Sequence, residues 1–153
     1  MSEIARIAQL LEETFEGTPY YGRSVLGTLE PVTADIAIRK PTWSAHSIWE
    51  LVTHLTAELN YARTVIEGKD PGPWIEGQTT WPPITDTAEG AWRQAIQDLT
   101  HANRELVRIV RQLDDAILDK NAIRVQSSFY VMLHGTLQHN VYHAGQISLL
   151  KGK

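Results

Sequence analysis

Apolar residues recur along most of this chain at the three- and four-residue spacing of amphipathic helices, and strand-like alternation is scarce. In the first segment, for example, Ile4, Ile7, Leu11 and Phe15 form one stripe of an expected helix. The predicted helices span residues 3–15, 47–67, about 86–113 and from Ser127 or Ser128 to Leu150, with a short one from Arg23 or Ser24 to Pro31. Most of the chain is therefore expected to be helical.

Start and stop signals support two of these helices. Ser47 and Glu50 have the spacing of a capping box, in which each side chain accepts a hydrogen bond from the other residue's backbone amide. Gly68 supplies a permissive residue just beyond the end of that helix. The run from Asp86 to Glu89 resembles a second cap, at the start of the next long helix.

Residues 69–85 separate these two helices and contain Pro71, Pro73, Pro82 and Pro83. A loop of this length without secondary structure is uncommon and often forms a lid or the wall of a site. Four long amphipathic helices with almost nothing else predict an all-α fold, a four-helix bundle. At 153 residues, the chain is expected to form one domain over residues 1–153.

Composition narrows the classes of function. The chain has no cysteine, which excludes disulfides, thiolate zinc sites and a cysteine nucleophile. A net charge of −4 disfavours nucleic acid as a partner. No apolar run approaches the ~20 residues that cross a membrane, and the N-terminus lacks the pattern of a signal peptide. We therefore expect a cytoplasmic protein that binds neither membranes nor nucleic acid.

Candidate chemistry centres on the six histidines. His139 and His143 are four residues apart on one predicted helix, so both rings point to one side and can converge on one ion. His134 lies about 140° away around the same axis, since each residue turns the helix by about 100°. We do not expect His134 to join the pair.

A third ligand is needed from another helix, and His54 is the best candidate. It lies in the middle of a helix beside the buried stripe of Leu51 and Leu55, where a histidine has no packing advantage. His46 and His101 rank lower because of their positions. Glu50 and Glu58 lie one turn to either side of His54. They are either extra ligands or, as the more common pattern, a cap and a solvated side chain.

Three segments of the sequence resemble blocks of the DinB-like family, the damage-inducible helical-bundle proteins. Residues 133–147 read LHGTLQHNVYHAGQI, whose H-x-x-Y-H-x-G-Q-I pattern is similar to the family's last helix. Residues 46–54, HSIWELVTH, resemble the block that ends in a ligating histidine. Residues 17–22, GTPYYG, resemble a third block, with Tyr20 where tryptophan is frequent.

This resemblance implies an up-down-down-up bundle that forms a homodimer and holds one divalent metal ion with His54, His139 and His143. Zinc or nickel is the expected ion, and iron and manganese are further candidates. The family and its relatives include S-transferases that use bacillithiol or mycothiol, a mycothiol-dependent maleylpyruvate isomerase, and proteins described as metal-dependent hydrolases.

Three histidines leave a coordination position open, which is the catalytic arrangement. The first hypothesis is a metal-dependent enzyme that transfers a low-molecular-weight thiol, its cosubstrate, to an electrophilic small molecule. The second is a hydrolase that activates water. The third is a dimeric bundle that binds metal or ligand without catalysis.

Several other side chains are candidates for supporting roles. Gln146 lies one turn beyond His143 and either orients a ligand or makes a hydrogen bond at the helix end. Tyr142 is interpreted as a packing residue. Trp74 and Trp81 either wall a substrate pocket or pack under the loop. Arg63 and Arg124 are candidates for holding an anionic thiol, although nothing in the sequence places them near the metal.

Overall fold

A computed structural model describes residues 1–75 and 77–152. Its helices are α1 (Glu3–Glu16), α2 (Val25–Leu29), α3 (Ala34–Ala37), α4 (Ile48–Ile66), α5 (Glu89–Val110), the 3-10 helix η1 (Asp115–Ile117) and α6 (Phe129–Leu150). No strand occurs among these described residues, and the all-α prediction is confirmed. The sequence did not predict α3 or η1, which are too short to show a hydrophobic period.

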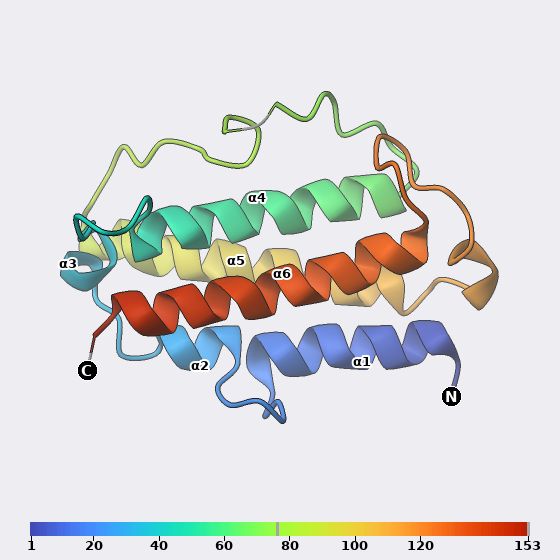
Figure 1. Ribbon diagram of the computed structural model, residues 1–153, viewed down its shortest axis with the longest axis horizontal. Helices are drawn as coiled ribbons and strands as arrows, with labels where there is room; N and C mark the ends of the chain where they lie inside the picture. Colours follow the sequence, from blue (N-terminus) through green and yellow to red (C-terminus); the bar gives the residue numbers. More distant parts are fainter. Residues whose placement is uncertain (76, 153) are drawn as a thin grey trace.

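The four long helices lie alongside one another (Figure 1). Helix α4 packs against α5 and α6, and α1 packs against the same two helices from the other side. Helices α1 and α6 run in one direction, while α4 and α5 run in the other (Figure 1). The two helices that carry the candidate ligands, α4 and α6, are therefore neighbours.

Side-chain caps explain most of the helix starts. The predicted capping box is present, because Ser47 Oγ accepts from the Glu50 amide at 3.1 Å and a Glu50 carboxylate oxygen accepts from the Ser47 amide at 2.7 Å. Ser128, and not Ser127, caps α6 by accepting from the Val131 amide.

The cap expected at Asp86 is wrong. Asp86 Oδ1 accepts from the Ala88 amide two residues on, which closes an Asx turn, and α5 begins only at Glu89. An aspartate before a helix can satisfy either arrangement, and the local sequence does not distinguish them. The predicted end near Leu113 is also too late, because α5 ends at Val110.

The core lies between the four long helices and is built from their apolar stripes. On α4, Leu51, Val52, Leu55 and Leu59 are almost completely buried. Between α4 and α5, residues 67–75 and 77–88 pass back along the outside of α4 (Figure 1). Where residues 67–88 are described, they contain no helix or strand, as the prolines predict. This segment, called the strap below, covers the side of α4 that carries His54.

Candidate metal centre

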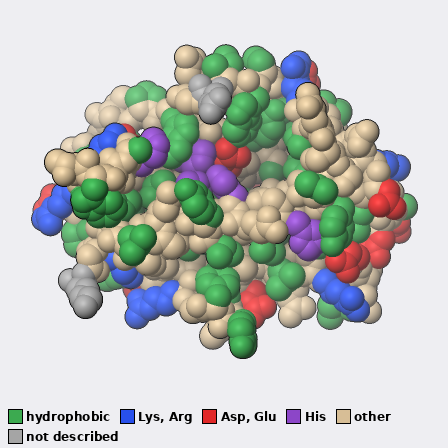
Figure 2. Space-filling model, in the orientation of Figure 1, with side chains coloured by type: hydrophobic (Ala, Val, Ile, Leu, Met, Phe, Trp, Pro, Cys, Tyr) green, Lys and Arg blue, Asp and Glu red, His purple; other side chains and the backbone are tan. Residues whose placement is uncertain are grey.

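His54, His139 and His143 meet between α4 and α6, as predicted. His54 Nε2 lies 3.2 Å from His139 Nε2, and His143 Nε2 lies 3.0 Å from the same atom. One nitrogen of each ring lies within 4.8 Å of those of the other two rings. Figure 2 shows histidine side chains gathered at a hollow on this face, with an acidic side chain beside them. His134 does not belong to this cluster, as its place on the helix predicts.

Hydrogen bonds fix the tautomers of two of the rings. His54 Nδ1 lies 2.8 Å from the carbonyl oxygen of Thr80, and His143 Nδ1 lies 2.5 Å from Gln146 Oε1. Both partners are acceptors, so each Nδ1 carries the proton and donates. The Nε2 atoms of His54 and His143 therefore present lone pairs toward His139 Nε2, the arrangement that outer hydrogen bonds impose on metal-ligating histidines.

The donor set fits a divalent cation. Neutral His139 has at most one Nε2 proton, which satisfies only one of the two facing lone pairs. A cation bound between the rings accepts a nitrogen lone pair from each of the three. Two nitrogens bound to one zinc ion at about 2.0–2.1 Å are separated by about 2.8–3.4 Å when the bond angle is between about 90° and about 109°. The separations of 3.2 and 3.0 Å agree with this range.

All three rings are held in the neutral form that metal binding requires. Burial is the largest cause that lowers the pKa of each ring, and the neighbouring histidines lower it further. The pKa falls to about 4 for His139 and His143 and is also lowered for His54. Protons therefore compete weakly for these lone pairs near neutral pH.

Glu58 lies beside the cluster, one helical turn after His54. Its Oε1 is 3.9 Å from His54 Nε2, and its side chain is 22% exposed. Burial raises the pKa of Glu58 to about 7, while a hydrogen bond with the Thr80 side chain lowers it. The interpretation of Glu58 as a solvated residue is therefore wrong, because the strap covers it. Glu50 is a cap, as the more common pattern indicated.

Two residues of the strap contact the His54 ring. Thr80 supplies the carbonyl acceptor for Nδ1, and the Trp81 ring stacks on the His54 imidazole with centroids 4.0 Å apart and planes 6° apart. His46 stacks on the other face of Trp81 at 3.7 Å. Sequence reasoning missed Thr80 completely, because a backbone acceptor in a loop has no residue signature. Trp81 was identified only as a candidate pocket wall.

Gln146 accepts from His143 through Oε1 and donates through Nε2 to the Tyr142 hydroxyl at 3.1 Å. The amide therefore orients a ligand histidine, which was one of the two predicted roles. Tyr142 is 62% exposed, and its ring meets the His143 ring edge to face with centroids 5.0 Å apart, so it packs against a candidate ligand and outside the core. Its hydroxyl accepts from the Gln146 amide nitrogen, while the amide oxygen faces the imidazole.

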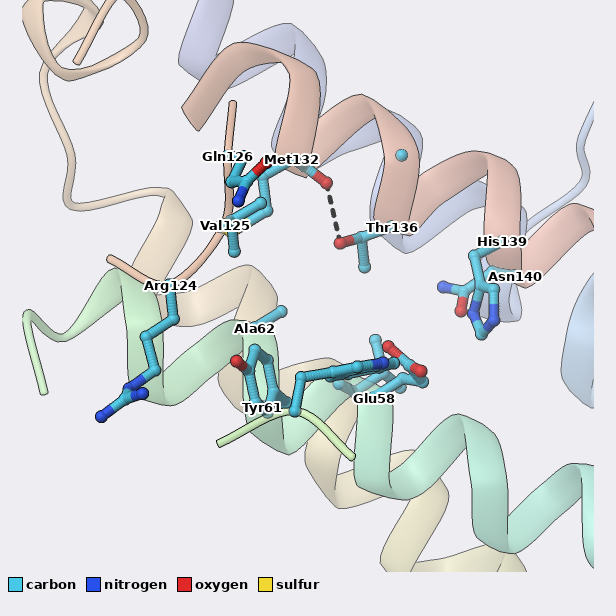
Figure 3. A pocket seen from close by; sticks show the side chains of 13 residues that line it. Glu58, Tyr61, Ala62, Arg124, Val125, Gln126, Met132, Thr136, His139 and Asn140 are labelled. Carbon is cyan, nitrogen blue, oxygen red and sulfur yellow. Dashed lines mark hydrogen bonds between the residues drawn. The ribbon is translucent and has the colours of Figure 1, made fainter. Parts of the chain in front are cut away.

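A cavity of about 410 Å³ begins at His139 and Glu58 and extends between α4 and α6. Figure 3 shows His139 and Asn140 at one end, Tyr61 and Thr136 midway, and Arg124, Val125 and Gln126 at the other end. Trp74 from the strap also lines it. Of the two arginines considered from sequence, Arg124 lies in this wall and Arg63 does not.

A model of a known protein family matches most of the chain. Residues 21–147 match the model of the DinB superfamily, a span that includes all three histidines, Glu58 and Gln146. A search of curated proteins found no match. No helix in the described part of the chain has the length and hydropathy needed to cross a bilayer. The chain belongs to the DinB superfamily.

Proposed function

We propose that His54, His139 and His143 bind one divalent metal ion, zinc or nickel in the first instance, and that the protein is a metal-dependent thiol transferase. It would add a low-molecular-weight thiol to an electrophilic small molecule in the cavity. The observation that carries the proposal is the convergence of three imidazoles, one of which, His139, lines the end of that cavity. Iron and manganese remain alternative ions for the same three nitrogens.

The residues divide into ligands and supports. Thr80 and Gln146 hold two rings in the tautomer that presents Nε2 to the ion. Trp81 restrains the plane of His54 by stacking. A bound divalent ion would supply a Lewis acid that favours the thiolate form of a thiol or the ionisation of water. The chain has no cysteine, so the thiol must come from a cosubstrate.

Glu58 is the group that can move the proton. Its carboxyl lies at the metal end of the cavity, 3.9 Å from His54 Nε2, within reach of a proton on a thiol or water that approaches the same ion. In the proposed reaction a sulfur–carbon bond forms, and the thiol proton passes to a Glu58 carboxylate oxygen. The electron pair displaced from the attacked carbon takes that proton back, so that thiol and electrophile combine in one product.

Two measurements test this function. Elemental analysis should find about one divalent ion per chain, because the residues that the structure describes contain one such cluster of three ligands. Chromatography of the products from a panel of epoxides and activated alkenes should show adducts only when a thiol and the metal are both present. Turnover that is the same without thiol would refute the transferase. Stoichiometric metal without turnover on the whole panel would indicate a bundle that binds metal without catalysis.

A hydrolase is the second candidate, and Glu58 is the observation that favours it. A carboxylate 3.9 Å from a ligand nitrogen is within reach of a water molecule that approaches the same ion. Product analysis separates the two functions, since a hydrolase forms water adducts or cleaved products without thiol.

The assembly also forms part of the proposal. We infer that the four long helices correspond to the up-down-down-up bundle of DinB-like proteins and that residues 1–153 act as one domain. The family resemblance further supports a homodimer. Light scattering coupled to size-exclusion chromatography would measure a molar mass near twice 17.2 kDa for a dimer.

A further inference from the structure

The wall of the cavity between α4 and α6 is mostly apolar. Leu59, Ala62, Val125 and Met132 contribute aliphatic or thioether surface. Tyr61 and Trp74 meet edge to face with ring centroids 5.0 Å apart, and both rings line the space. A volume of about 410 Å³ lies within the ~300–1,000 Å³ of pockets that bind small organic ligands.

The cationic side chain in this wall already forms an ion pair with a carboxylate. Among the described lining residues, Arg124 is the one Lys or Arg. Its guanidinium forms a two-pronged ion pair with Asp70 of the strap, through Nε to Oδ1 and through Nη2 to Oδ2 at 2.7 Å. Asp70 Oδ1 also accepts from the Gly72 amide. An anionic group at this end would meet a carboxylate as well as the arginine.

Polar side chains line the opposite end of the cavity, away from Arg124. Asn140, beside His139, is 1% exposed, and its amide nitrogen has no hydrogen-bond partner among the residues that the structure describes. Glu58 and His139 complete this end. A carbonyl or hydroxyl oxygen of a ligand would satisfy the Asn140 donor next to the proposed metal. The cavity thus has a polar end and an apolar body.

We propose that the substrate carries an uncharged, largely aromatic group that fills this cavity, with its reactive end at His139 and Asn140 and no anionic group near Arg124. The orientation rests on the proposed metal function, whereas the preference for an uncharged body rests on the cavity alone. Transfer of a carboxylate from water into an apolar cavity is unfavourable unless an unpaired cation lies beside it. Arg124, the one cationic side chain among the described lining residues, is already paired with Asp70.

The test compares two thiols that differ at one position. 2-Phenylethanethiol and 4-(2-mercaptoethyl)benzoate have the same thiol end, but the second has a carboxylate at the far end. Calorimetry on the zinc-loaded protein should give at least about tenfold tighter binding of the neutral thiol, because the charged group loses hydration and meets the Asp70 carboxylate beside an arginine that is already paired. Equal affinities, or tighter binding of the carboxylate, would overturn the proposal.

A change at Asp70 should reverse this preference. Asp70→Asn keeps an amide oxygen for the Gly72 amide but releases Arg124, so the benzoate should gain at least about tenfold in affinity through a charge-assisted bond. Asp86→Asn is the matched control, since Asp86 belongs to the same strap and closes a similar turn outside the cavity. An Asp70→Asn protein whose preference equals that of the control would contradict the role assigned to the ion pair.

Gly135→Leu tests the location. Gly135 lines the cavity, and a Cβ built there meets no atom within 4 Å, so the backbone tolerates a side chain and a leucine would take up part of the cavity. Binding of 2-phenylethanethiol should fall at least about tenfold. Gly90→Leu, at an equally open helical position outside the cavity, should leave it unchanged. Unchanged binding by Gly135→Leu would place the aromatic group elsewhere.

The same comparison can be made without the metal. Ethylbenzene and 4-ethylbenzoate lack the thiol and report only on the cavity. If the protein binds no zinc but still prefers ethylbenzene, the proposed function fails and the inference about the cavity stands. If zinc binds and the two compounds bind equally, the inference about the cavity fails and the metal site stands.

Discussion

Gln146→Ala gives the sharpest test of how the fold prepares a ligand histidine. Gln146 Oε1 accepts from His143 Nδ1 at 2.5 Å, and this contact selects the tautomer whose Nε2 faces the other rings. In Gln146→Ala the acceptor is lost, so Nδ1–H has no protein partner and the ring can turn or change tautomer. The variant should therefore retain the fold but bind zinc more weakly.

The size of the loss can be estimated from the type of bond. An imidazole that binds a cation becomes a stronger donor at Nδ1, so its hydrogen bond has charge-assisted character, worth about 1.5–3 kcal/mol. Loss of a hydrogen bond behind a metal ligand typically weakens binding about 10- to 100-fold, equivalent to about 1.4–2.7 kcal/mol. We therefore expect the dissociation constant for zinc to rise by this factor.

Two companion variants separate orientation from general damage. Gln146→Glu retains an acceptor for Nδ1–H and should bind zinc at least as tightly as the unmodified protein. Tyr142→Phe removes only the hydroxyl that accepts from Gln146 Nε2 and should change affinity by less than about threefold, as expected for one exposed neutral hydrogen bond.

Competition with a chromophoric chelator at pH 7.5 measures the zinc affinity of each variant, and circular dichroism verifies the fold. The reasoning fails if Gln146→Ala binds zinc as tightly as the unmodified protein. It also fails if Gln146→Glu binds as weakly as Gln146→Ala while both are folded.

Further predictions concern the ligands, pH and helix capping. His143→Ala should remove most bound metal by elemental analysis, whereas His134→Ala, on the same helix but outside the cluster, should retain it. In the metal-free protein, the free energy of unfolding should fall as the pH drops from about 6.5 to about 4. The reason is that the unfolded chain takes up protons on His139 and His143, whose pKa values are lowered to about 4 in the fold. Glu58, whose pKa is raised to about 7, takes up its proton more readily in the folded protein, so it adds stability as the pH falls from about 7 to about 4.5. Urea unfolding of Glu58→Gln should therefore show a steeper loss of stability on acidification. Ser47→Ala removes one half of the capping box and should cost about 1 kcal/mol in urea unfolding, and no loss would contradict a capping role.

The sequence predicts those parts of the site that depend on helical geometry. His139 and His143 are one turn apart on a single helix, so their convergence needs no knowledge of the tertiary fold. Gln146 follows from the same periodicity. His54 does not follow from the period of one helix, because it is 85 residues away from His139 in the chain. Its position beside a buried stripe, together with the family resemblance, indicates that it is the third ligand.

The strap is the part that the sequence could not predict. Proline and glycine indicate that residues 69–85 lack regular structure, but they do not determine the path of a loop over a helix. The Thr80 carbonyl, the stacking of Trp81 and the burial of Glu58 all depend on that path. The Asp70–Arg124 ion pair depends in addition on the loop before α6, which meets the strap only in the folded protein.

One segment therefore determines both halves of the site. Near its middle, Thr80 and Trp81 fix the tautomer and the plane of His54, while nearer its start Asp70 and Trp74 set the charge and the shape of the far end of the cavity. Thr80 follows Asp70 by ten residues and Trp81 follows Trp74 by seven, and the two pairs contact different groups. A substitution at Asp70 can therefore alter which substrate body is accepted while the His54 contacts remain. The histidine cluster can in this way stay constant while the strap changes the specificity.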